Sequence, residues 1–153
     1  MGNHEALLLD AFENEKNTSK WIQNGGAETL KSFEISSLND IQSKYIEFFK
    51  KLKYYYSSND FLFVHAGFNN NVLNPFTDYY SMLWKCKESY TNPLLSDKTI
   101  IHGHNPISIS KCEERVLSKP DVINIDTGCA YNDKEGFGRL TAYDCNTQRI
   151  LFA

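Results

Sequence analysis

The stretch FLFVHAG, residues 61–67, places a histidine, an alanine and a glycine directly after four apolar residues. A short continuous apolar run of this kind predicts a β-strand that is buried on both faces. Two later stretches also pass from apolar residues into a polar segment that contains a glycine, TIIHGH at residues 99–104 and VINIDTG at residues 122–128. Buried strands that each lead into a glycine-containing turn predict an α/β fold for the chain.

The segments on either side of these strands predict helices before them and a hairpin after them. Residues 4–12 are rich in helix-forming residues, and a second short helix is expected to begin within residues 27–30. At the other end of the chain, residues 139–143 and 149–152 are two further strand candidates, with Asn146 at a turn between them. Their closeness in the sequence predicts an antiparallel hairpin.

The strongest helical periodicity covers residues 39–55. One apolar stripe is expected there, formed by Ile41, Tyr45, Phe48 and Leu52. Ser37 and Asp40, three residues apart, have the spacing of an N-terminal cap for this helix.

Three polar segments predict loops, namely residues 56–60, 69–77 and 132–138. None of them is long enough to separate two domains. Residues 1–153 are therefore expected to form a single domain, a length that is ordinary for one hydrophobic core.

Composition excludes several classes of function. The net charge is -3 and basic residues form no long run, which argues against binding to nucleic acid or to an anionic membrane. No apolar run approaches the ~20 residues of a membrane-spanning helix, and the first residues do not resemble a signal peptide. The four cysteines are widely spaced, which favours reduced thiols and a cytoplasmic location.

Histidines gather where the predicted strands end. His65 and His104 each follow a strand, and the carboxyl ends of neighbouring strands in an α/β sheet lie on one rim. Asn3 and His4, at the start of the first helix, could reach the same rim. Imidazole nitrogens and an amide oxygen are suitable ligands for a divalent transition metal. Because side chains alternate along a strand, we expect His104 rather than His102 to face this site.

Three of these segments together resemble the last three signature blocks of calcineurin-like metallophosphoesterases. They are GNHE at residues 2–5, VHAG at residues 64–67 and GHNP at residues 103–106. Four further segments are similar to blocks of the bacterial serine/threonine protein phosphatase branch. These are residues 21–33 (WIQNGGAETLKSF), 83–84 (LW), 123–131 (INIDTGCAY) and 138–142 (GRLTA), in order along the whole chain.

The resemblance implies a fold, an activity and a set of site residues. The fold would be the C-terminal part of a metallophosphoesterase β-sandwich with flanking helices. The activity would be metal-dependent hydrolysis of phosphate monoesters, with phosphoproteins or small phosphoesters as substrates. Asn3, His65 and His104 would bind the second of two metal ions (manganese, iron or zinc), and His4 would protonate the departing alkoxide.

The chain departs from the family pattern at places that matter for catalysis. The D-x-H and G-D-x-x-D-R blocks, which supply the first metal's ligands and the bridging carboxylate, precede G-N-H-E in the family, and neither occurs among the 153 residues. The arginine of the L-W-x-R block, a phosphate contact, falls at Cys86. We therefore expect an N-terminally truncated domain that holds at most one metal ion, and self-association through an uncovered sheet edge.

Two other functions fit the same segments. Dinucleoside-polyphosphate hydrolases share the late blocks of the family, so this activity is an alternative substrate class. A non-catalytic remnant or binding module that retains the fold is a second alternative, of a different class.

Overall fold

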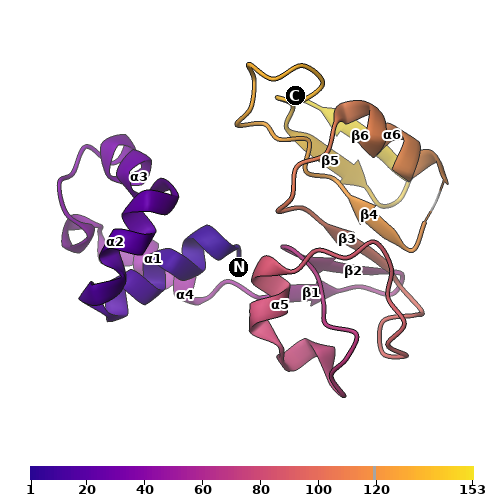
Figure 1. Ribbon diagram of the computed structural model, residues 1–153, viewed down its shortest axis with the longest axis horizontal. Helices are drawn as coiled ribbons and strands as arrows, with labels where there is room; N and C mark the ends of the chain where they lie inside the picture. The colour runs from indigo at the N-terminus through magenta and orange to yellow at the C-terminus, as the bar shows by residue number, and fades with distance from the viewer. Residues whose placement is uncertain (119) are drawn as a thin grey trace. The chain divides into compact units, whose positions relative to one another are not determined.

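The computed structural model describes residues 1–118 and 120–153. The chain divides into two units, Met1–Lys53 and Tyr54–Ala153 (Figure 1). The expectation of one domain over residues 1–153 stays a prediction.

The unit of residues 1–53 is built from helical segments. They are α1 (Asn3–Glu13), a 3₁₀ turn (Glu15–Asn17), α2 (Thr18–Trp21), a π-helical turn (Ile22–Gly26), α3 (Ala27–Ser32), a 3₁₀ turn (Leu38–Asp40) and α4 (Ser43–Lys50). The buried apolar side chains of this unit include Leu7, Leu8, Trp21 and Ile46. The helices predicted over residues 4–12 and from residues 27–30 are confirmed by α1 and α3.

The long helix predicted over residues 39–55 is wrong in extent. Ser37 and Asp40 do form the expected capping box, but the helix that it caps is the short 3₁₀ turn. The backbone is already extended at Ile41, with ψ 122°. The helix α4 therefore begins only at Ser43 and ends at Lys50. Phe48, a member of the predicted apolar stripe, is 59% exposed. Local side-chain capping and the β-prone tyrosines that follow α4 outweigh the apolar periodicity.

The unit of residues 54–153 contains two sheets and two helices among its described residues. Its elements are β1 (Tyr55–Ser57), β2 (Phe61–Val64), a 3₁₀ turn (Pro75–Thr77), α5 (Tyr79–Trp84), β3 (Thr99–His102), α6 (Ile109–Ser118), β4 (Val122–Asn124), β5 (Thr141–Asp144) and β6 (Arg149–Phe152). The mixed four-stranded sheet has the order β1-β2-β3-β4, and β5 and β6 form a separate antiparallel pair.

The strand predictions hold in this unit. β2, β3 and β4 are the three apolar runs; β2 pairs with β3 and β3 with β4, both in parallel. The hairpin at the end of the chain is confirmed by the pairing of β5 with β6. One loop prediction is wrong in part, because Tyr56 and Ser57 belong to the edge strand β1, which pairs antiparallel with β2.

Side chains alternate across the four-stranded sheet and form a core on each face. One core includes Leu62, Ile100 and Val122, which pack with Met82 of α5. The opposite core combines Ile101 and Ile123 with Val116 of α6, and side chains of β5 and β6 pack against it. Figure 1 shows α6 beside the β5–β6 hairpin, in agreement with their contacts. The sheet is thus covered on both faces, and its strand ends are held at a fixed spacing.

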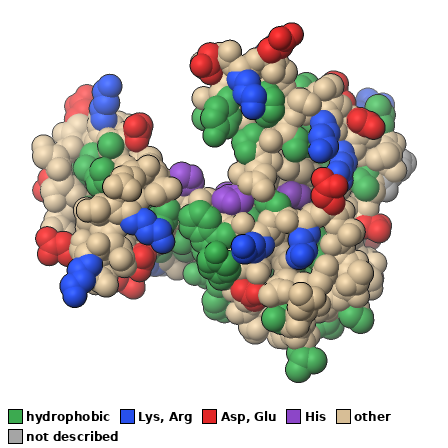
Figure 2. All heavy atoms as spheres, in the orientation of Figure 1, with side chains coloured by type: hydrophobic (Ala, Val, Ile, Leu, Met, Phe, Trp, Pro, Cys, Tyr) green, Lys and Arg blue, Asp and Glu red, His purple; other side chains and the backbone are tan. Residues whose placement is uncertain are grey.

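On the face drawn in Figure 2, acidic and basic side chains are interspersed in each unit. In the described part of the chain, no helix is long and apolar enough to cross a membrane.

Tyr90 makes the stability of the unit sensitive to alkaline pH. Its hydroxyl accepts a hydrogen bond from the backbone N–H of Phe68 at 3.0 Å, and burial raises the pKa of Tyr90 from 10.0 to about 12. Between these values the unfolded chain binds fewer protons than the folded one. The contribution of Tyr90 to the free energy of unfolding is therefore fully present below pH 10. It is lost as the pH rises towards 12, and the loss is at most about 2–3 kcal/mol.

Tyr90→Phe should remove this alkaline loss, although it also removes one hydrogen bond. We expect the variant to be less stable than the wild type at pH 9 and to lose less stability between pH 10 and pH 12. Urea unfolding at several pH values measures both. Tyr131→Phe, at a tyrosine that is half exposed, is the matched control and should follow the wild-type slope. If the free energy of unfolding fell equally between pH 10 and pH 12 in Tyr90→Phe and in the wild type, Tyr90 would not be the cause of the alkaline loss.

Candidate metal centre at the strand ends

Two histidines meet beyond the ends of β2 and β3. His65 directly follows β2, and His104 follows β3 after one glycine. His65 Nε2 lies 3.0 Å from His104 Nδ1, and the two rings meet edge to face. The backbone N–H of Gly103 donates to the His65 carbonyl at 2.9 Å, so the two turns are joined. Parallel pairing of β2 with β3 thus brings together residues that are 39 apart in sequence.

His104 adopts a backbone conformation that is uncommon for its residue type. Its φ is +76°, in the left-handed region that favours glycine. A residue held there costs of order 1–3 kcal/mol, and such residues gather at functional sites. The imidazole is half-buried and lies edge-on to the Trp84 indole, with ring centroids 5.8 Å apart. The strained turn directs the ring towards His65.

The spacing of the two imidazoles fits two neighbouring ligands of one metal ion. Ligand nitrogens at metal distances of about 2.0–2.1 Å and ordinary coordination angles lie about 3.0–3.3 Å apart, close to the separation of His65 and His104. Neutral imidazole suits zinc, iron and other divalent transition metals. Over residues 1–118 and 120–153, no group of three or more His, Cys, Asp or Glu side chains is arranged to hold a metal. The pair alone therefore offers two ligands.

His102 has different surroundings from His104. Its Nδ1 lies 3.0 Å from the Gly103 carbonyl oxygen. Its ring lines a cavity that is also lined by Cys86 and Asn105. The side chain is buried, and this burial lowers the pKa of His102. The choice of His104 over His102 as a ligand stays a prediction, and the contact with His65 is consistent with it.

Cys86 occupies the place where the resemblance expects an arginine. Its Sγ donates a hydrogen bond to the Gly103 carbonyl at 3.4 Å, and burial raises the pKa of the Cys86 thiol. A neutral thiol supplies no charge for a phosphate. Lys85, one residue earlier, lies over the Tyr80 ring at 5.6 Å from its centroid. Neither side chain reproduces a planar guanidinium.

Asn3 and His4 lie in the unit of residues 1–53, where they begin α1. His4 Nδ1 lies 2.7 Å from the Asn24 carbonyl oxygen, which fixes the ring. Gly25 has a φ of +93°, and a Cβ at that position would lie 3.6 Å from His4 Nδ1. The turn after α2 thus packs closely on this imidazole. That Asn3 and His4 join His65 and His104 stays a prediction.

Asp126, which the ligand prediction did not include, lies in the turn after β4. Its Oδ1 accepts a hydrogen bond from the Gly128 N–H at 2.9 Å, and a Cβ on Gly103 would lie 3.3 Å from the Asp126 Cβ. The D-T-G motif could have indicated this position, because Asp commonly bonds to a backbone N–H two residues later. Asp126 shapes the third of the three strand-end turns.

Comparison with known proteins gives no match. No family model matches the chain, and no curated protein or solved structure matches it at the significance required. The function must therefore be argued from the residues and their geometry.

Proposed function

We propose that the chain is the part of a calcineurin-like metallophosphoesterase that carries the strand-end histidines, of the bacterial serine/threonine protein phosphatase type. Its reaction is hydrolysis of phosphoserine and phosphothreonine monoesters. The four-stranded sheet with helices and a hairpin on its faces is compatible with the C-terminal part of the family's sandwich.

The observation that carries the proposal is the 3.0 Å approach of His65 Nε2 to His104 Nδ1. These are two of the three residues that the resemblance assigns to one metal ion. The two histidines meet at the carboxyl ends of parallel strands, and this is the edge of an α/β sheet at which ligands bind. The left-handed backbone of His104 adds to this argument, because strain of that kind needs a compensating role.

Each residue has a defined part in the proposed reaction. A divalent ion, when bound, would act as a Lewis acid towards the phosphoryl oxygens. His65 and His104 would hold it, with Asn3 as a third ligand. His4 would donate a proton to the leaving alkoxide of serine or threonine, and its contact with the Asn24 carbonyl fixes the ring for that task.

Substrate class is tested with a protein in which a segment carrying D-x-H and G-D-x-x-D-R precedes this chain. We expect this protein to hydrolyse a phosphoserine peptide at a higher kcat/KM than a diadenosine polyphosphate, because the proposed site takes a monoester. Release of inorganic phosphate and of nucleotide, measured with manganese, separates the two. Preference for the diadenosine compound would favour the dinucleoside-polyphosphate hydrolase. A lack of turnover on either would favour the non-catalytic binding module.

A further inference from the structure

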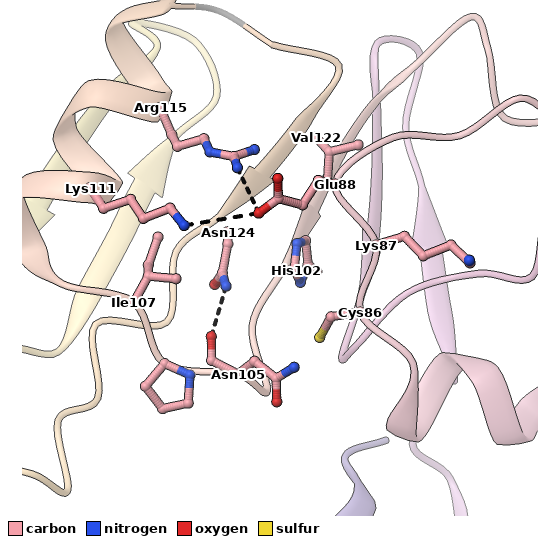
Figure 3. A pocket seen from close by; sticks show the side chains of 11 residues that line it. Cys86, Lys87, Glu88, His102, Asn105, Ile107, Lys111, Arg115, Val122 and Asn124 are labelled. Carbon is pink, nitrogen blue, oxygen red and sulfur yellow. Dashed lines mark hydrogen bonds and ion pairs between the residues drawn. The ribbon is translucent and has the colours of Figure 1, made fainter.

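The cavity that His102 lines lies where β4 forms an edge of the sheet. Its volume is about 250 Å³. It is formed by side chains from the loop after α5, the turn after β3, the helix α6 and the strand β4 itself (Figure 3). The volume is below the range of about 300–1,000 Å³ that drug-sized ligands occupy, so the cavity suits a small group.

Two basic side chains of α6, Lys111 and Arg115, line this cavity and form ion pairs with the carboxylate of Glu88. Arg115 Nη2 lies 2.8 Å from Glu88 Oε1, and Lys111 Nζ lies 3.9 Å from the same oxygen. Figure 3 shows both basic side chains directed at Glu88, while Lys87 points away from them. Arg115 holds the pKa of the Glu88 carboxyl below its usual value, so this group is ionised at neutral pH. The two cations thus share one carboxylate as an ion-pair partner.

The Glu88 carboxylate marks the place beside Arg115 and Lys111 at which a bound anion would be stabilised. Its side chain is 74% exposed, whereas that of Arg115 is 24% exposed. An ion pair with one partner so exposed is weak, so a competing anion displaces the carboxylate at little cost. A guanidinium binds phosphate oxygens in a bidentate manner and a lysine adds a point charge. A doubly charged oxyanion gains more from these two cations than the single Glu88 carboxylate does.

We propose that the cavity between α6 and the loop after α5 binds a phosphoryl oxyanion, held by Arg115 and Lys111 in the place of the Glu88 carboxylate. The oxyanion is inorganic phosphate or the phosphoryl group of a phosphorylated side chain. The site uses neither His65 nor His104, and it does not depend on the hydrolase proposed above.

The test is an NMR titration of the metal-free 153-residue protein with inorganic phosphate and with phosphoserine, at constant ionic strength. We expect saturable shifts of the Arg115 and Lys111 signals, with dissociation constants in the millimolar range. Arg115→Gln should weaken binding about tenfold or more. Glu88→Gln should tighten it several-fold, because it removes the competing carboxylate. Tighter binding of phosphoserine than of phosphate would identify a phosphorylated side chain as the ligand, and the reverse would identify the free ion.

Two further variants control for charge and for the metal centre. Lys31→Gln changes the net charge as much as Arg115→Gln does, at an exposed position in the unit of residues 1–53, and should leave binding unchanged. His65→Ala should also bind phosphate normally, which separates this site from the proposed hydrolase. Equal weakening by Lys31→Gln and Arg115→Gln, weaker binding by Glu88→Gln, or shifts that do not saturate in the folded wild-type protein would each overturn the proposal.

Discussion

The 153-residue chain is expected to release no measurable phosphate from a small aryl phosphate, even with added manganese. Hydrolysis of phosphate monoesters is among the slowest uncatalysed reactions, so nearly all of the rate must come from the site. The chain contains no D-x-H or G-D-x-x-D-R pattern, and its predicted ligands are neutral. Neutral ligands cannot offset the charge of two divalent ions, and Cys86 supplies no cation for the phosphate.

Supplying a segment with both patterns ahead of residue 1 should restore manganese-dependent turnover. In that protein, His65→Ala and His104→Ala should abolish activity, and His4→Ala should lower kcat by about 10²–10⁴ because proton donation typically contributes that much. His102→Ala, at the neighbouring cavity, is the matched control and should have a small effect. Robust turnover by the 153-residue chain alone, lost on His4→Ala, would contradict the prediction.

Gly67→Ala is expected to destabilise the unit of residues 54–153 by about 2–5 kcal/mol. A Cβ at this buried position would lie 2.5 Å from the Lys85 carbonyl oxygen and still closer to the Tyr90 hydroxyl. Accommodating it must displace the backbone after α5, or break the hydrogen bond from the Phe68 N–H to Tyr90. The glycine of V-H-A-G is thus required by packing, which keeps the turn after His65 close to the loop after α5.

Urea unfolding measures this effect, with Gly103→Ala as the control. A Cβ on Gly103 meets its nearest neighbour, the Asp126 Cβ, at 3.3 Å, so a shift of a few tenths of an ångström accommodates it. We expect that variant to lose far less stability. Adding Tyr90→Phe to Gly67→Ala should recover part of the loss by removing the hydroxyl. An unchanged urea midpoint for Gly67→Ala would show that the turn is not packed as described.

The strands and the paired histidines could be predicted because the signals are local. Apolar runs at residues 61–64, 99–101 and 122–125 each end in polar or glycine-containing turns, and strands of one parallel sheet share a rim. The contact of His65 with His104 follows from that rule. The family's own sandwich and the membership of Asn3 and His4 in the site rest on the resemblance, and they remain predictions.

Other features depend on contacts that a single sequence does not reveal. The predicted helix over residues 39–55 followed a periodicity that the capping of a 3₁₀ turn interrupts at Ile41. The short edge strand β1 spans the end of the predicted helix, at Tyr55, and the start of the polar segment predicted as a loop, at Tyr56 and Ser57. Arg115 and Glu88 are 27 positions apart and meet through the packing of α6 beside β4, so the cavity that they line left no signal in the sequence.

Metal stoichiometry tests the central claim most directly. Equilibrium dialysis of the 153-residue chain against manganese or zinc, followed by metal analysis, should find at most one ion per chain. That ion should be weakly held, because two imidazoles and one amide leave the rest of its shell to water. His65→Ala and His104→Ala should each remove it, whereas His102→Ala should retain it. Two tightly bound ions per chain, or one that survives both substitutions, would contradict a metal centre built on His65 and His104.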